Sequence, residues 1–127
     1  MTSPAGSATV LLISRDLFFT SKVTGTASSL GIAVQVVSNA EAAAAHVIAG
    51  EFCCIFIDLA DLGLDVAAFF GRLGAQDRPP VIAFGSHVAT ARLQAAREAG
   101  CDDVMPRSRF SASLPDLLQK YCGPPAK

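Results

Sequence analysis

The sequence predicts an α/β domain in which a five-stranded, parallel, doubly wound sheet is covered by helices on both faces. Three observations lead to this prediction. Five apolar segments alternate with five segments of helical periodicity, and the connections between them are short. The first four apolar segments are continuous or nearly so, which is typical of strands buried on both faces. Because crossovers between parallel strands are right-handed, repeated strand–helix units place helices on both sides of one sheet.

The predicted strands are short and rich in Val, Ile, Leu, Phe and Cys. The fifth is the least regular, because Pro106 has no amide hydrogen to donate to a neighbouring strand and therefore indicates a strand end. In chain order the five predicted strands are Thr9–Ile13, Ala33–Val37, Cys53–Ile57, Val81–Phe84 and Asp103–Pro106.

Each predicted helix has an apolar stripe at spacings of three and four residues. Ser38 or Asn39 is suited to cap the second helix. Gly31, Gly50 and Gly100 follow predicted helices, where a left-handed residue often ends the helix and glycine is favoured. The stripes are Phe19, Val23, Ala27 and Leu30; Ala40, Ala43, Ala44, Val47 and Ile48; Val66, Phe69, Phe70 and Leu73; Leu93, Ala96 and Ala99; and Leu114, Leu117, Leu118 and Tyr121.

Size and composition limit the function classes. The chain has 127 residues, 51% hydrophobic and 17% charged, with a net charge of −1. This balance predicts one domain at residues 9–122 between flexible tails at 1–8 and 123–127, and it lacks the basic field that attracts nucleic acid or anionic lipid. Apolar runs fall short of the ~18–20 residues needed to span a bilayer, and the N-terminus lacks a signal-peptide pattern. We therefore expect a cytoplasmic protein.

The cysteines do not form a recognisable metal or disulfide motif. Adjacent Cys53 and Cys54 are expected to point to opposite faces of a strand, and no CxxC is present. We predict that the four cysteines are buried thiols that behave as small hydrophobic residues, with no metal site. A reactive Cys101 or Cys122 is the alternative.

Polar and charged residues follow four of the predicted strands. In an open parallel sheet, ligands and reactive groups gather at the carboxyl ends of the strands. We therefore expect a candidate site there. The residues at these ends are Ser14, Arg15 and Asp16 after the first strand, Asp58 after the third, Gly85 and Ser86 after the fourth, and Arg107 and Ser108 after the fifth.

With these strand ends, the chain resembles the receiver domain of two-component response regulators from Thr9 to Cys122. The segments that resemble it best are CCIFIDL, PVIAFGS and AGCDDVMPR. The resemblance implies a flavodoxin-like fold with strand order 2-1-3-4-5. It also implies a pocket with an acidic pair that binds Mg²⁺, a phospho-accepting aspartate, a Ser or Thr, and a Lys–Pro pair.

Only the phospho-acceptor is retained among these positions. Asp58 matches the acceptor, but Ser14 and Arg15 stand where the acidic pair is expected. Magnesium prefers carboxylate and water oxygens, so a fixed cation at Arg15 opposes its binding. Asp16 is either a substitute ligand or the cap of the first helix, and we favour the cap. Asp61 and Asp65 are expected to be a loop residue and a helix cap.

The switch residues of receivers are also replaced. Gly85 stands at the hydroxyl position, Arg107-Ser108 at the Lys–Pro pair, and Val104 where many receivers have an aromatic ring. Ser86 lies one residue late, and a one-residue shift along a strand reverses the side chain's direction. The resemblance therefore implies a degenerate pseudo-receiver that is not an enzyme and needs no cofactor.

We expect an ion pair at the position of the missing metal. Asp58 should pair with Arg15, Arg107 or both, because a guanidinium binds carboxylate in a rigid geometry. In the alternative arrangement, Asp58 is hydrogen-bonded only within its loop and Arg107 points to solvent.

These residues predict a signalling module that works by protein contact. Its partner would be a kinase, another receiver or an output domain, and a homodimer is left open. The expected contact face lies on the last two helices and the strand between them, with Val104, Arg92, Arg97 and Arg109. Leu17 and Phe18 cannot both face the core beside Phe19. The alternatives are a phospho-accepting regulator that uses Asp58 and Mg²⁺, and a small-ligand sensor at the strand-end crevice.

Overall fold

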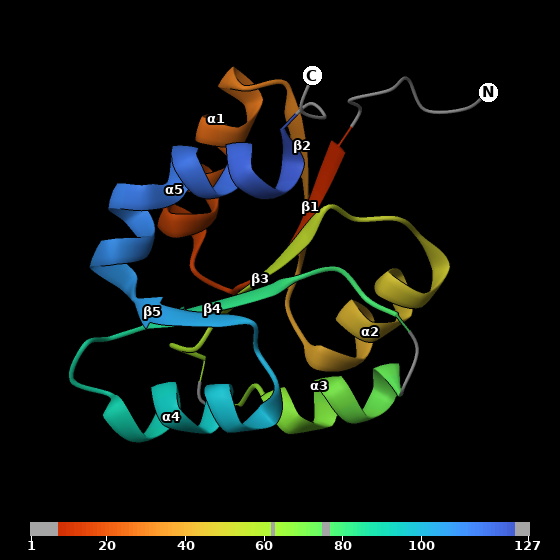
Figure 1. Ribbon diagram of the computed structural model, residues 1–127, viewed down its shortest axis with the longest axis vertical. Coiled ribbons are helices and arrows are strands. Elements are labelled where there is room, and N and C mark those ends of the chain that lie inside the picture. The colour runs from red at the N-terminus through yellow and green to blue at the C-terminus, as the bar shows by residue number, and fades with distance from the viewer. Residues whose placement is uncertain (1–7, 62, 75–76, 124–127) are drawn as a thin grey trace.

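The sheet is five-stranded and parallel in the computed structural model, which describes residues 8–61, 63–74 and 77–123 (Figure 1). Its strand order is β2-β1-β3-β4-β5, as the resemblance implies. The elements are β1 (Ala8–Ile13), α1 (Leu17–Ser29), β2 (Ile32–Val37), α2 (Ala40–Ala49), β3 (Cys54–Asp58), α3 (Val66–Leu73), β4 (Val81–Gly85), α4 (Thr90–Ala99), β5 (Asp103–Pro106) and α5 (Arg107–Cys122). The proposed tails at residues 1–7 and 124–127 lie outside the described residues, whereas Ala8 belongs to β1.

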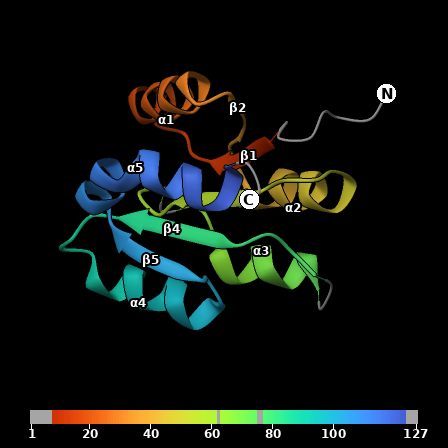
Figure 2. The same ribbon diagram turned by 45° about the horizontal axis from the view of Figure 1, so that its top comes forward.

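Two hydrophobic cores lie on opposite faces of the sheet. Helices α1 and α5 cover one face, and α2, α3 and α4 cover the other (Figure 2). The first core contains four aromatic rings, and Phe110 of α5 stacks on Phe84 of β4 with ring centroids 4.1 Å apart. Because β1, β3 and β4 are covered on both sides, their apolar runs are almost completely buried, as predicted.

The prediction of burial on both faces is wrong for β2. This strand pairs only with β1 at the edge of the sheet, and Val36 is 37% exposed. An edge strand has a neighbour on one side only, and the apolar sequence of β2 does not reveal which strand occupies the edge.

Three aspartate or asparagine side chains begin helices as predicted. Asp16, Asn39 and Asp65 accept hydrogen bonds from the backbone amides of Phe19, Ala42 and Ala68 at 3.0, 2.7 and 3.0 Å. Asn39, rather than Ser38, therefore caps α2.

The glycines that follow the helices differ in conformation. Gly31 and Gly100 adopt positive φ angles of 76° and 121° and end their helices as predicted. The prediction is wrong for Gly50, whose backbone is extended, so α2 ends without a left-handed residue.

Helix α5 begins directly after β5, with Pro106 as its N-cap residue. Arg107 is therefore the first helical residue and lies at the carboxyl edge of the sheet. The predicted stripe is partly correct, since Leu114, Leu117 and Leu118 are buried. Phe110 and Cys122 extend the buried face, while Tyr121 is only half-buried.

Candidate functional site

Asp58 is a buried carboxylate at the carboxyl end of β3, with 2% of the residue exposed. Its Oδ2 accepts a hydrogen bond from the Ser14 hydroxyl at 2.8 Å. Its Oδ1 accepts from the backbone amide of Ala60 at 3.0 Å and from Nη2 of Arg107 at 2.7 Å. A buried charge needs such partners because burial removes it from water. Both oxygens of Asp58 are therefore engaged by neighbouring side chains and backbone.

Arg107 joins two acidic residues from different strand ends. Besides the ion pair with Asp58, its Nη1 lies 3.3 Å from Oδ2 of Asp16. Oδ1 of Asp16 accepts from the Phe19 amide, so one carboxylate both caps α1 and pairs with the arginine. The predicted ion pair between Asp58 and Arg107 is thus confirmed, and so is the helix cap at Asp16.

Arg15 does not share this role. Its side chain belongs to the lining of a hollow of about 310 Å³ beside Asp16 and Asp58, but the residue is exposed. Among the described residues Arg15 forms no ion pair with Asp58, so of the two predicted partners only Arg107 pairs with it. The two arginines differ in position. Arg107 begins a helix that packs on the sheet, whereas Arg15 lies in the short segment between β1 and α1.

Aromatic rings support the Arg107 guanidinium from beneath. Its Cζ lies 4.6 Å from the ring centroid of Phe19 and 5.6 Å from that of Phe84. Cations are attracted to the faces of such rings, and the attraction grows when the cation is desolvated. From the sequence, Phe19 was assigned only to the apolar stripe of a predicted helix, and Phe84 was given no role at the site. The sequence signal for this role is weak. It consists of one aromatic residue at the next-to-last position of β4 and another in the first turn of α1.

Two acidic side chains face the single cation of Arg107 at this site. The hydrogen bond from the Phe19 amide lowers the pKa of Asp16, burial acts in the opposite direction, and the Arg107 charge lowers the pKa further. Asp16 is therefore ionised at neutral pH. Its charge, together with a carboxylate at Asp58, faces the cation of Arg107.

The residues present do not fit the magnesium site of a working receiver. Three of the four carboxylate oxygens of Asp16 and Asp58 accept hydrogen bonds from groups other than Arg107, and the fourth accepts from Arg107. A divalent ion would have to displace the guanidinium from Asp58, and Ser14 replaces a carboxylate ligand with a hydroxyl that already donates.

The strand-four position lacks a hydroxyl near Asp58. A Cβ on Gly85 would lie 3.1 Å from Cβ of Leu59 and 3.6 Å from Cδ2 of Leu93, so packing favours glycine here. Ser86 is exposed, and its Oγ accepts from the Val88 amide at 3.3 Å rather than approaching Asp58. The hydroxyl that contacts Asp58 comes instead from Ser14 on the β1 side.

The predicted contact face requires correction at two positions. Val104 is only 8% exposed and belongs to the core under α4. Arg92 is half-buried, and its Nε and Nη2 donate to the carbonyls of Leu59 and Asp61 at 2.9 and 3.1 Å. Both residues therefore stabilise the fold. Arg97 and Arg109 are exposed as predicted.

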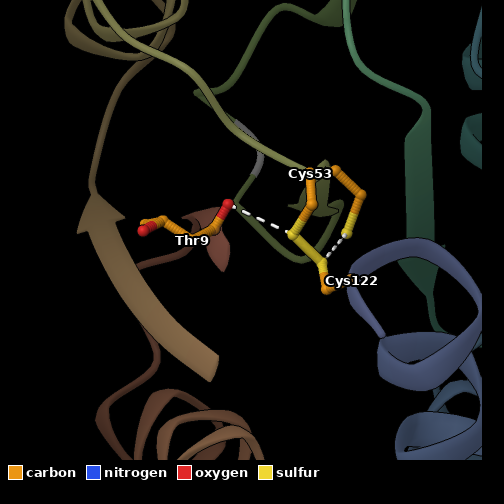
Figure 3. The surroundings of a disulfide bond; sticks show 4 residues. Thr9, Cys53 and Cys122 are labelled. Carbon is orange, nitrogen blue, oxygen red and sulfur yellow. Dashed lines mark hydrogen bonds between the residues drawn. A yellow bond between two sulfur atoms is a disulfide. The ribbon is translucent and has the colours of Figure 1, made fainter. Parts of the chain in front are cut away.

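The cysteine prediction is also wrong in part. Cys53 and Cys122 form a disulfide, with their Cα atoms 5.2 Å apart, and Cys54 Sγ lies 3.7 Å from Cys122 Sγ (Figure 3). Cys53 precedes β3, so strand alternation does not separate it from Cys54, and the three sulfur atoms lie within 4.8 Å of one another. Cys54 and Cys101 are free thiols, and burial raises the pKa of each to about 12.

Searches by sequence and by structure give different results. No protein-family model matches the sequence, and no curated protein matches it either. The receiver domain of the sensor histidine kinase PA1611 from Pseudomonas aeruginosa, solved with a magnesium ion in its active-site cleft, is similar with a TM-score of 0.77. It is 21% identical, and the match covers 92% of this chain and 98% of that one.

Two further solved structures lead to the same fold. A response regulator from Hahella chejuensis has a TM-score of 0.78 at 14% identity, with 91% of this chain and 95% of that one covered. The signal receiver domain of a response regulator from Bermanella marisrubri has a TM-score of 0.76 at 19% identity, with 91% and 98% covered. The fold is therefore that of receiver domains. Within the described residues, no helix is long and apolar enough to cross a membrane.

Proposed function

We propose that this chain is a receiver-type signalling module that acts through protein contacts without phosphorylation, and that it has no enzymatic activity. The observation that carries this proposal is the ion pair between Arg107 and the buried Asp58, at 2.7 Å. In this arrangement a cation of the protein takes the place of the divalent ion, and the site is held in one conformation.

The chemistry of phosphoryl transfer supports the proposal. A carboxylate that accepts a phosphoryl group needs a free oxygen and a cation that stabilises the charge on the transferred group, usually a metal ion. Asp58 has Ser14 on one oxygen and Ala60 and Arg107 on the other. An incoming phosphoryl group would therefore have to break an existing contact at either oxygen.

The surface beside the site supports a protein partner. Leu17 and Phe18, in the first turn of α1, are 81% and 92% exposed and lie next to Asp16. Neighbouring large apolar side chains on a surface favour contact with another protein. The first turn of α1 is therefore favoured over Arg97 and Arg109 as the contact region. The partner class is a kinase, another receiver or an output domain.

A phosphodonor experiment tests the proposal. The protein is incubated with acetyl phosphate and Mg²⁺ and its intact mass is measured, beside an ordinary receiver domain as positive control. We expect no phosphoryl adduct on the native chain, because Arg107 occupies the acceptor carboxylate. A stable single adduct on the native chain that is absent from Asp58→Ala would overturn the proposal.

One observation favours the second candidate, a phospho-accepting regulator. Asp16, Asp58 and Asp61 all line the same hollow, so carboxylates are present near the position where a receiver binds its metal ion. The Arg107→Ala variant distinguishes the two candidates. If only this variant gains the adduct, Arg107 prevents phosphorylation. An adduct of equal yield on the native chain supports the second candidate.

A further inference from the structure

Helix α5 is attached to β3 at both of its ends. Its first residue, Arg107, forms the ion pair with Asp58, the last residue of β3. Its last residue, Cys122, is bonded to Cys53, which directly precedes β3 (Figure 3). An electrostatic contact therefore holds one end of the helix, and a covalent bond that can be reduced holds the other.

We propose that Cys53 and Cys122 form a reversible thiol-modification site that reacts with low-molecular-weight thiols and disulfides of the glutathione class. The state of this site decides whether the last turn of α5 is covalently attached to the start of β3. This inference does not depend on the proposed function, because it concerns the opposite end of β3 from Asp58.

The two cysteine residues differ in exposure. Cys53 is half-buried, whereas Cys122 is only 5% exposed. The Cys53 sulfur lies 3.3 Å from the carbonyl oxygen of Thr9 at the start of β1 (Figure 3). Thiol–disulfide exchange depends on which sulfur an attacking thiolate can reach. A small thiolate therefore attacks Cys53, and Cys122 is the leaving group.

The exchange takes place in two steps, and atoms and electrons balance in each step. In the first, a small thiolate bonds to the sulfur of Cys53, the Cys53–Cys122 bond breaks, and the released Cys122 thiolate takes up a proton. In the second, another small thiolate attacks the small molecule's sulfur in this mixed disulfide and releases Cys53, which is protonated in turn. Two small thiols are thereby oxidised to one disulfide, and the protein disulfide is reduced. The reverse reaction consumes one small disulfide.

Cys54 lies beside the bond but is not expected to exchange with it. Its sulfur is 3.7 Å from that of Cys122, close enough for contact. The residue is completely buried, and burial raises the pKa of its thiol to about 12, so the nucleophilic thiolate is almost absent at neutral pH. Cys122 therefore pairs with Cys53 rather than with Cys54.

A redox titration tests the proposal on the full chain. The protein is equilibrated at a series of reduced-to-oxidised glutathione ratios with EDTA present, quenched in acid, denatured, and alkylated for intact mass and peptide mapping. Of the four cysteines, two are free, so we expect two alkylated thiols at oxidising ratios and four at reducing ratios, with one transition. Peptide maps should place the bond between Cys53 and Cys122.

Matched variants keep the test decisive. Cys53→Ser changes a half-buried residue, and it should show three alkylated thiols at every ratio, whereas Cys101→Ser should keep the transition. Hydrogen exchange of the native chain gives an independent readout: on reduction, amides in the last turn of α5 should exchange at least tenfold faster, and those of α4 should not change. The proposal is overturned if the pair stays closed or open at all ratios, or if Cys54 is the residue bonded to Cys122.

Discussion

At the scale of single residues, Asp58 depends on its neighbours for stability. Ser14, Ala60 and Arg107 together provide three donors to a carboxylate that water hardly reaches. Removing one partner of a buried ion pair is costly because the remaining charge stays buried without compensation. The stability of the site is therefore expected to depend mainly on the cation of Arg107.

Replacing Arg107 should test this dependence. We expect Arg107→Ala to lower the free energy of unfolding by about 3 kcal/mol, measured by urea denaturation, because Asp58 loses its counter-ion. Adding Asp58→Asn should recover part of the loss and show a coupling of about 1 kcal/mol or more in a double-mutant cycle. The exposed Arg109→Ala is the matched control, with an expected change within about 0.5 kcal/mol. An equal loss in both arginine variants would contradict the role of the ion pair.

Gly85 shows how packing prevents a simple return to the receiver pattern. Gly85→Thr would supply the missing hydroxyl, but its Cβ would be 3.1 Å from Leu59 Cβ. We expect the substitution to lower stability by about 1–3 kcal/mol, as overpacked side chains do, and to lower Tm in thermal denaturation. Ser86→Thr, at the exposed neighbouring position, should leave Tm nearly unchanged. A Gly85→Thr protein as stable as the native chain would show that Leu59 moves aside freely.

At the scale of elements, a further aspartate, Asp102, joins the segments that lead into β4 and β5. Asp102 accepts from the Val81 amide and from Arg78 Nη1, both at 2.8 Å, and Arg78 Nη2 also donates to the carbonyl of Gly100. These contacts connect the start of β4 with the residues that precede β5. They hold the edge strand that ends beside Arg107.

The pH dependence of stability should report these contacts. Burial tends to raise the pKa of Asp102, but the hydrogen bonds from Arg78 and Val81 outweigh it, and the pKa lies below its ordinary value of 3.8. Its stabilising contribution is therefore complete above that value and is lost as the pH falls through the lowered pKa. Since the side chain is 46% exposed, we expect a contribution below about 1 kcal/mol.

The measurement is the unfolding free energy between neutral pH and the acid range. Asp102→Asn should show a smaller acid-induced loss than the native chain, because the amide keeps an acceptor but does not titrate. Asp103→Asn, at the exposed neighbouring position, is the control and should follow the native curve. An identical acid dependence in Asp102→Asn and the native chain would show that this carboxylate does not contribute.

At the scale of the whole molecule, α5 connects the two ends of the sheet. Its first residue belongs to the candidate site, its middle packs on the aromatic core, and its last residue forms the disulfide (Figures 1 and 3). In the receiver fold this helix lies on the same face as α1, whose exposed Leu17 and Phe18 form the proposed contact region. A partner bound there would lie beside a site held by an ion pair.

The amino-acid sequence alone was sufficient for the order of strands and helices, the caps at Asp16 and Asp65, and the position of Asp58 at a strand end. These features depend on local periodicity and on hydrogen bonds within a few residues, which neighbouring residues specify directly. Resemblance to receivers supplied the strand order and the meaning of the replaced residues.

Only the tertiary structure decided which groups meet. Arg107 lies 49 residues from Asp58, and Cys122 lies 69 residues from Cys53, so neither pairing follows from spacing along the chain. How a helix packs against a particular strand decides three features of this protein. These are the pairing of Asp58 with Arg107 instead of Arg15, the aromatic rings beside the Arg107 guanidinium, and the burial of Val104. Periodicity specifies the buried face of an element, but the partner of that face depends on the arrangement of the whole sheet.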